Sequence, residues 1–117
     1  MTNKTTSLSQ FPNVLQKQSQ TVSSTSSTAI ATFNQSELDT ARVLVSAVRG
    51  SDKQVSELLV IHDGVDAYAT EYGVVTTNGV LFTIDVDISG SNVRILTEGT
   101  ASTETVYTTF LTLIGAN

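Results

Sequence analysis

The sequence predicts an all-β fold, namely an antiparallel β-sandwich or jelly-roll-like barrel of about seven strands behind an extended N-terminal arm. Runs of β-branched and other apolar residues alternate with polar residues at a period of two, which is typical of half-buried strands. Short segments rich in Gly, Asn, Asp and Ser separate these runs. Near the N-terminus a Ser/Thr-rich stretch has too few apolar residues to build a core.

The Ser/Thr-rich stretch sets the expected boundary between an arm, residues 1–27, and a β-sandwich domain, residues 28–117. Residues 19–28 include eight hydroxyl side chains in ten, so we expect them to be disordered or to form a loosely paired edge strand.

The apolar residues of the arm are candidates for binding a partner. Phe11, Val14 and Leu15 have the i, i+3, i+4 spacing of one helical turn. One turn is not stable by itself, so we favour an extended arm whose apolar side chains enter pockets of a partner.

The strands are expected at seven places, and one of them is ambiguous. Residues 40–49 fit a helical stripe through Leu38, Ala41, Val45 and Val48, but their β-branched content favours a strand. Asn78-Gly79 predicts a two-residue hairpin. The expected strands start at residue 28 and continue with 40–49, 54–62, 67–76, 80–88, 93–97 and 104–114.

Several expected strands are apolar on both faces, although one face of each sheet in a small sandwich normally contacts water. Leu58 and Val60 oppose Leu59 and Ile61 in this way. Excess apolar outer surface is typical of contact with other subunits.

Composition and charge exclude several classes of function. The chain has no cysteine, which rules out disulfides and thiol chemistry, and its net charge is −5. Residues 1–36 carry +2 and residues 37–117 carry −7, so the body repels nucleic acid. No apolar run follows Lys4 or approaches the length of a membrane span, so we expect neither a signal peptide nor a membrane partner.

The candidate catalytic residues have simpler structural interpretations. His62, the only histidine, precedes Asp63-Gly64 and is expected to hydrogen-bond a turn. Asp85 and Asp87 share a strand face, and Arg94 is expected to pair with one of them. We therefore expect no enzyme activity, no metal and no cofactor.

Two tyrosines leave an alternative open. Tyr68 and Tyr72 share one face of the strand over 67–76, which suits either packing or a sugar-stacking platform. The chain has no tryptophan, which weakens the sugar alternative.

The motif from Glu57 to Arg94 resembles a small domain of virion structural proteins of tailed phages, especially those of marine cyanobacteria. The similarity covers roughly residues 40–114 and rests on Glu before an apolar run, His-Asp-Gly, Tyr-x-Thr-Glu-Tyr-Gly and Val-Arg-Ile-Leu. The residues that carry the motif are Glu57, His62, Asp63, Gly64, Tyr68, Glu71, Tyr72, Gly73 and Arg94.

The resemblance implies an all-β particle protein without catalytic residues. In this motif Asp63-Gly64 is suited to a turn and Gly73 to a bulge, while Glu57, Glu71 and Arg94 are candidates for cross-strand charge pairs.

The most specific expectation is a capsid decoration or cement subunit, bound to the shell through the arm and homo-oligomeric in the particle. It would be made in the host cytoplasm and released by lysis. The alternatives are a tail fibre, baseplate or neck subunit, and a carbohydrate-binding module for surface glycans.

Overall fold

The computed structural model describes residues 15–37 and 39–114, which form eight β-strands. No helix in this part of the chain is long and apolar enough to cross a membrane. The strands are β1 (Leu15–Val22), β2 (Thr28–Asn34), β3 (Thr40–Arg49), β4 (Asp52–His62), β5 (Ala67–Thr76), β6 (Phe82–Ser89), β7 (Asn92–Gly99) and β8 (Thr105–Ile114).

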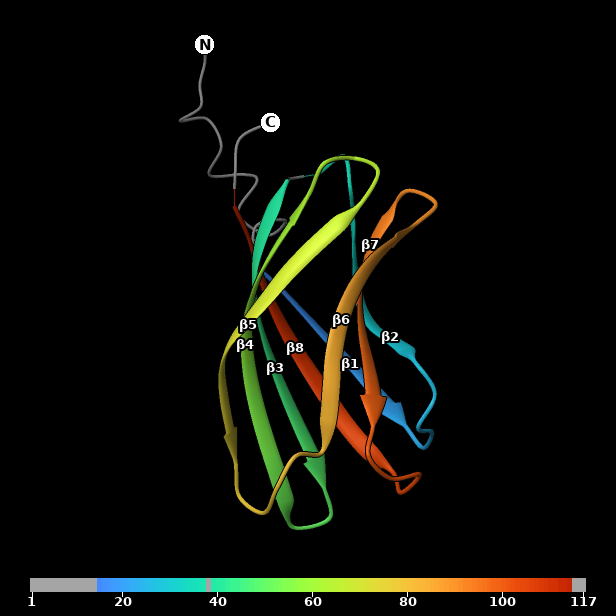
Figure 1. The fold of residues 1–117 in the computed structure, drawn as a ribbon, viewed down its shortest axis with the longest axis vertical. Coiled ribbons are helices and arrows are strands. Elements are labelled where there is room, and N and C mark those ends of the chain that lie inside the picture. Colours follow the sequence, from blue (N-terminus) through green and yellow to red (C-terminus); the bar gives the residue numbers. More distant parts are fainter. Residues whose placement is uncertain (1–14, 38, 115–117) are drawn as a thin grey trace.

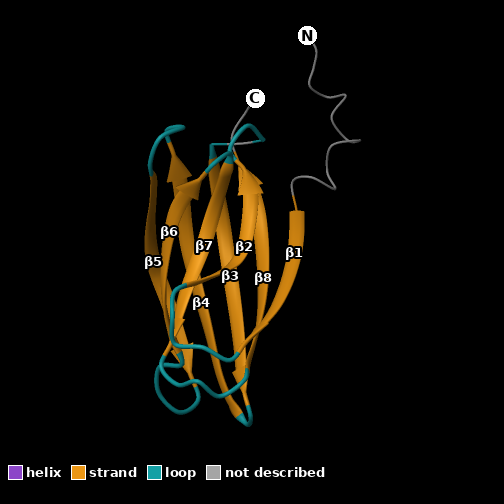
Figure 2. Cartoon of the chain, turned by 90° about the vertical axis from the view of Figure 1, so that its right-hand side faces the viewer, coloured by secondary structure: helices purple, strands orange, loops and turns teal. Residues whose placement is uncertain are grey.

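The strands form two antiparallel sheets that face each other (Figure 1). One sheet has five strands in the order β1-β8-β3-β4-β5, and the other has three in the order β2-β7-β6. Figure 2 shows β1 at one margin of the molecule and β5 at the other. The expected all-β sandwich is therefore confirmed.

The core consists of the side chains that the two sheets turn toward each other. Val43, Val45 and Leu111 of the larger sheet and Val93 and Ile95 of the smaller one are fully buried. The Phe82 and Tyr107 rings meet edge to face, with centroids 5.3 Å apart. The same two rings join the sheets, because Phe82 lies on β6 and Tyr107 on β8.

The ambiguous segment 40–49 is a strand. Ala41, Val43, Val45 and Ala47 are buried, whereas Leu44 is exposed, which is the period of two that a strand requires. The helical alternative is wrong, since it would have placed Val45 and Val48 on the same buried face.

A bulge in β2 changes the expected alternation there. The register with β7 shifts between Ala29 and Ala31, so that Ile30 and Ala31 are both buried. The extra residue in one strand brings two consecutive side chains to the core side. Strict alternation would have put Ile30 on the outer face.

The predicted hairpin at Asn78-Gly79 is wrong. Gly79 does have a positive φ of 86°, as a turn requires, but β5 and β6 lie at the edges of different sheets. The chain instead crosses from one sheet to the other at Leu81 and Phe82, which are 3% and 1% exposed. Burial of these two side chains at the end of the sandwich outweighs local pairing.

Two side chains hold the backbone of this crossover. The buried Gln54 accepts a hydrogen bond from Leu81 N at 2.6 Å. Arg49 donates to Leu81 O at 2.9 Å through Nη2, and to the hydroxyls of Thr100 and Thr105 at 3.0 and 2.9 Å. We call this set the Leu81 clasp; it links the ends of β3, β4 and β8 to the crossover.

The expected arm includes a strand of the sheet. Residues 15–22 form β1, which pairs with β8 from Leu15↔Thr112 to Val22↔Thr105. The division at residues 27 and 28 remains a prediction about domains. Within the expected arm, Leu15–Val22 is an edge strand, one of the two states expected for the Ser/Thr-rich stretch.

Gln18 ties this edge strand to the other sheet. Its amide oxygen accepts from Thr32 N at 3.1 Å and its amide nitrogen donates to Thr32 O at 2.7 Å. The Gln18 amide thus makes the two backbone hydrogen bonds that a neighbouring strand would make at this point on the edge of β2.

Replacing Arg49 with Ala should lower the free energy of unfolding by roughly 1.5–3 kcal/mol, because hydrogen bonds from a charged donor to Leu81 and two hydroxyls are lost. Urea denaturation at pH 7 measures the change. Arg42→Ala is the matched control, since Arg42 makes an exposed ion pair and its loss should cost much less. Equal effects of the two variants would contradict a structural role for the clasp.

Replacing Gln18 with Ala should speed hydrogen exchange at the Thr32 amide and lower the free energy of unfolding by roughly 1–2 kcal/mol, because two hydrogen bonds are lost. Gln20→Ala, at an exposed position of the same strand, is the control. Unchanged protection of the Thr32 amide in Gln18→Ala would show that the amide does not hold the two edges together.

Candidate functional site

The outer face of the five-stranded sheet is apolar over its central strands. Residues directly opposite each other in a ladder share a face, and Leu44 lies opposite Phe110 while Val48 lies opposite Val106. Leu59 and Ile61 of β4 extend the same face. These six side chains are 37–51% exposed. We call this surface, together with its continuation on β5, the apolar face.

Strand β5 extends the apolar face with Tyr68, Tyr72 and Val75. Tyr68 lies opposite Ile61 and Val75 opposite Val55. The two tyrosines are 54% and 53% exposed, so packing within this chain does not account for them. Most of β5 is exposed on both faces, because it is the edge strand of the wider sheet.

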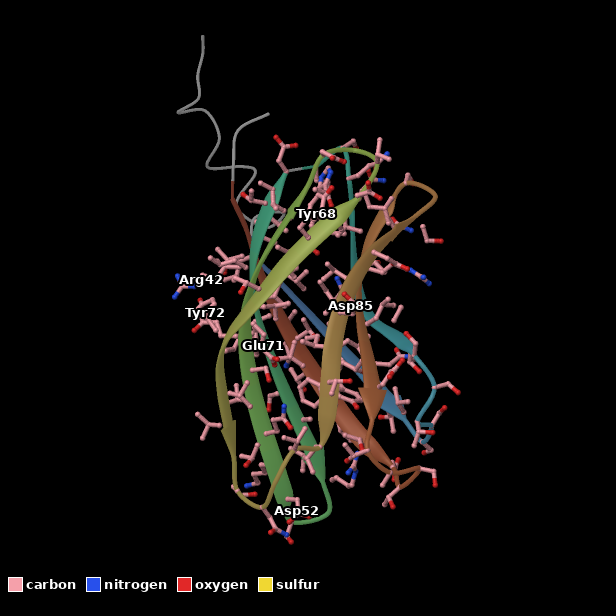
Figure 3. All side chains as sticks on the ribbon, viewed as in Figure 1. Arg42, Asp52, Tyr68, Glu71, Tyr72 and Asp85 are labelled. Carbon is pink, nitrogen blue, oxygen red and sulfur yellow. The ribbon has the colours of Figure 1, made fainter. Side chains whose placement is uncertain are left out.

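A polar group lies within the apolar face. Arg42 Nε donates to Glu57 Oε2 at 3.0 Å, and Arg42 and Tyr72 lie beside each other on the side of the sheet that points away from the sandwich (Figure 3). Hydrogen bonds from Arg42 and then from Tyr72 hold the pKa of Glu57 below its ordinary value. The negative charge of Glu57 is therefore neutralised by the neighbouring Arg42.

A bulge in β5 brings Tyr72 to this group. The register between β4 and β5 shifts at Glu57, which pairs with Gly73, while Leu58 pairs with Glu71. Tyr72 is thus the extra residue of a bulge, and a bulge redirects a side chain. Tyr72 and Glu57 are brought together in this way.

The apolar face is hollowed between β4 and β5. A groove of about 470 Å³ is lined by Leu59, Ile61, Tyr68 and Thr70, with Thr40 at its side. Its surface is almost entirely hydrocarbon, with few groups that could orient a polar ligand. The groove is suited to an apolar side chain.

The His62 motif lies at the end of β4, away from the centre of the apolar face. His62 is 7% exposed, and its Nδ1 accepts a hydrogen bond from Gly64 N at 3.0 Å. Asp63 accepts from the backbone N–H groups of Asp66 and Val65, which lower its pKa. These contacts form the turn between β4 and β5.

The remaining acidic candidates lie on the three-stranded sheet. Arg94 binds Asp87 through two hydrogen bonds of 2.7 and 2.6 Å, and the pKa of Asp87 is lowered by this partner. Asp85 accepts a hydrogen bond from Val86 N. Asp85 is labelled in Figure 3 on β6, far from Arg42 and Tyr72.

Of the other predicted residues, Glu71 lies on the opposite side of the sheet and Leu15 lies on the same outer side but on edge strand β1. Glu71 takes the core side of β5, opposite Leu58, and has no ion pair within residues 15–37 and 39–114. Leu15 begins β1 and is 62% exposed, whereas Phe11 and Val14 lie outside the described residues. The described residues include no group of three or more His, Cys, Asp or Glu side chains that could hold a metal ion.

Part of the apolar face was visible in the sequence, and part was not. The doubly apolar pattern of β4 predicted that one of the pairs Leu58/Val60 and Leu59/Ile61 faces outward, and the structure shows that it is Leu59 and Ile61. Leu44 and Val48 were hidden by the helix-or-strand ambiguity of residues 40–49, and their grouping with Phe110 and Val106 depends on the β3–β8 pairing. Only a correct sheet order brings these four together.

The geometry defines an antiparallel β-sandwich with an exposed apolar sheet face. Its fold is similar to part of a tailspike protein of Acinetobacter phage vB_ApiP_P1, whose crystal structure matches with a TM-score of 0.64 and 23% sequence identity over 83% of this chain. The chain spans 21% of the length of that tailspike. At this level of sequence identity, the structural similarity shows that the two share a fold.

A tailspike protein of Acinetobacter baumannii phage AM24 also matches, with a TM-score of 0.49 and 11% identity over 88% of this chain and 27% of the tailspike. No family model matches the sequence. No curated protein matches it either.

Replacing Arg42 with Met should raise the pKa of Glu57 toward the ordinary glutamate value, because the main hydrogen-bond donor and its positive charge are lost. Carboxyl NMR titration measures it directly. The pKa of Glu57 is lower in the folded than in the unfolded state. The interaction therefore stabilises the fold fully at a pH above the unfolded-state pKa, and this stabilisation is lost as the pH falls through the folded-state pKa. Asp87, held by Arg94, is the internal control and should titrate as before. An unchanged Glu57 pKa would contradict the assigned pair.

Proposed function

We propose that the chain is a structural component of a tailed-phage particle and that it belongs to the tail. The observation that carries this proposal is the likeness of 83% of the chain to a part of a phage tailspike at a TM-score of 0.64. The resemblance of residues 40–114 to phage virion proteins supports the same setting. The marine cyanobacterial host implied by that resemblance stays a prediction.

A structural role also agrees with how the reactive side chains are used. The only histidine accepts a turn hydrogen bond, Asp63 binds the same turn, and Asp87 is held by Arg94. A catalytic base needs a free lone pair near a substrate site, and these groups already bind within the fold. We therefore keep the proposal that this chain is not itself an enzyme.

The capsid decoration role is the second candidate. In that role the arm would bind the shell, and exposed Leu15 would contact the shell together with Phe11 and Val14. Because Leu15–Val22 already pairs with β8, the shell-binding arm would have to lie before this strand. The tail role needs no such arm, which is why we prefer it.

The glycan-binding role has less support. Exposure of Tyr68 and Tyr72 favours it, since sugars stack on exposed rings. The adjoining groove, however, has an almost wholly apolar lining, and Tyr72 also hydrogen-bonds Glu57. A sugar site requires convergent polar groups beside the ring.

The location can be tested on particles of the phage that encodes the chain. Purified particles are separated into heads and tails, and the chain is quantified in each fraction by mass spectrometry against the major shell and tail proteins. We expect it in the tail fraction, at a copy number comparable with tail components. Recovery with the heads at shell stoichiometry would support decoration instead, and absence from the particle would contradict both roles.

A further inference from the structure

We propose that the apolar face is a self-association surface and packs against the same face of a second copy of this chain. This inference concerns the assembly of the chain and does not depend on whether the chain belongs to the tail. It rests on four properties of the face: its apolar groups, its size, its charge and its shape.

The apolar side chains form two neighbouring groups, one on β8 and β3 and one on β4 and β5, with the Arg42–Glu57 ion pair between them. Phe110 on β8 adjoins Leu44 on β3, and Ile61 on β4 adjoins Tyr68 on β5. Isolated exposed apolar residues are common on proteins, but neighbouring groups of this kind mark an interaction site. The groove beside Leu59 adds a recess that can receive a side chain of the facing copy.

The size of the face fits a stable protein interface. Strands β8, β3, β4 and β5 are adjacent in the sheet, and each has 10 or 11 residues. With a strand spacing of about 4.8 Å and a rise of about 3.3 Å per residue, four strands of about ten residues cover about 600 Å² in projection, close to the ~800 Å² that each partner buries in a standard interface.

The charges of the face permit two copies to meet there. Residues 37–117 carry a net charge of −7, so most contacts between copies would bring carboxylates together. On the apolar face the acid is Glu57, which is already paired with Arg42. Of the cations on this side of the sheet, Arg42 is neutralised by Glu57, and Lys17 on edge strand β1 stands 6.0 Å from the centre of the Phe110 ring. The described part of the face therefore carries no unpaired acid that would repel the same face of a second copy.

The shape of the face favours a second copy over an unrelated partner. Twisted sheets pack face to face because their twists match, and an identical copy brings the same twist. The opposite face of this sheet already packs on β2, β7 and β6 in the same manner. Most soluble oligomers are also built from identical copies around a closed symmetry axis.

The mass of the full chain in solution tests the proposal. Light scattering after gel filtration and sedimentation velocity over a concentration series should give a dimer, because a contact between identical faces closes with two copies. Leu59→Asp places a carboxylate, which must lose its water on association, at the centre of the face and should weaken association by about a hundredfold, a size typical of a central interface residue. Phe110→Asp, on the other side of Leu44, should act in the same way.

Val65→Asp is the matched control. Val65 is 75% exposed in the turn between β4 and β5, away from the apolar face, so the same charge there should leave the oligomer intact. Circular dichroism and thermal unfolding of each monomeric variant establish that it is folded. Leu59 is 47% and Phe110 41% exposed, so both positions tolerate a polar side chain in the folded chain.

A folded wild-type monomer throughout the concentration series would overturn the proposal. So would an oligomer that survives both Leu59→Asp and Phe110→Asp. Neither result would affect the proposed tail location, which the particle fractions test separately.

Discussion

The crossover at Leu81 is the constraint on which the arrangement of the two sheets depends. Its backbone N–H is held by Gln54 and its carbonyl by Arg49, so this point is fixed to the ends of three strands of the larger sheet. The chain that follows must enter the other sheet as β6. Without that fixed point, the Asn78-Gly79 turn would favour a local hairpin, and the strand now in the smaller sheet would extend the larger one.

The crossover leaves the two sheets unequal, and this has consequences at both edges. Five strands face three, so β5 extends beyond the cover of the smaller sheet and is exposed on both sides. At the other end, Gln18 of β1 binds the backbone of Thr32 and closes the edge of β2. One edge is therefore protected by a side-chain amide, whereas the other ends in an open strand beside the apolar face.

The local pattern was sufficient for the strands but not for their order. Alternation through Val43 and Val45 is enough to identify β3, and an edge strand was one of the two states expected for the Ser/Thr-rich residues 19–22. The hairpin at Asn78-Gly79 failed because the decisive contacts of Leu81 come from residues 27 and 32 positions away. Ile30 was misplaced because a bulge has no strong sequence signature. The apolar face was predicted as an excess of apolar residues, but its outline required the β3–β8 pairing, which no local signal encodes.

Polar side chains are paired within the fold, whereas many large apolar side chains are exposed, and this contrast agrees with the proposed role in assembly. The polar groups that could take part in catalysis form hydrogen bonds within the fold: His62 in a turn, Asp87 with Arg94, and Glu57 with Arg42. Among the described residues, most of the large apolar side chains that are exposed lie on one sheet face. A small sandwich buries a limited fraction of its surface and is only marginally stable alone. Covering that face would add apolar burial to the fold at the same time as it joins the copies, so association and stability are coupled.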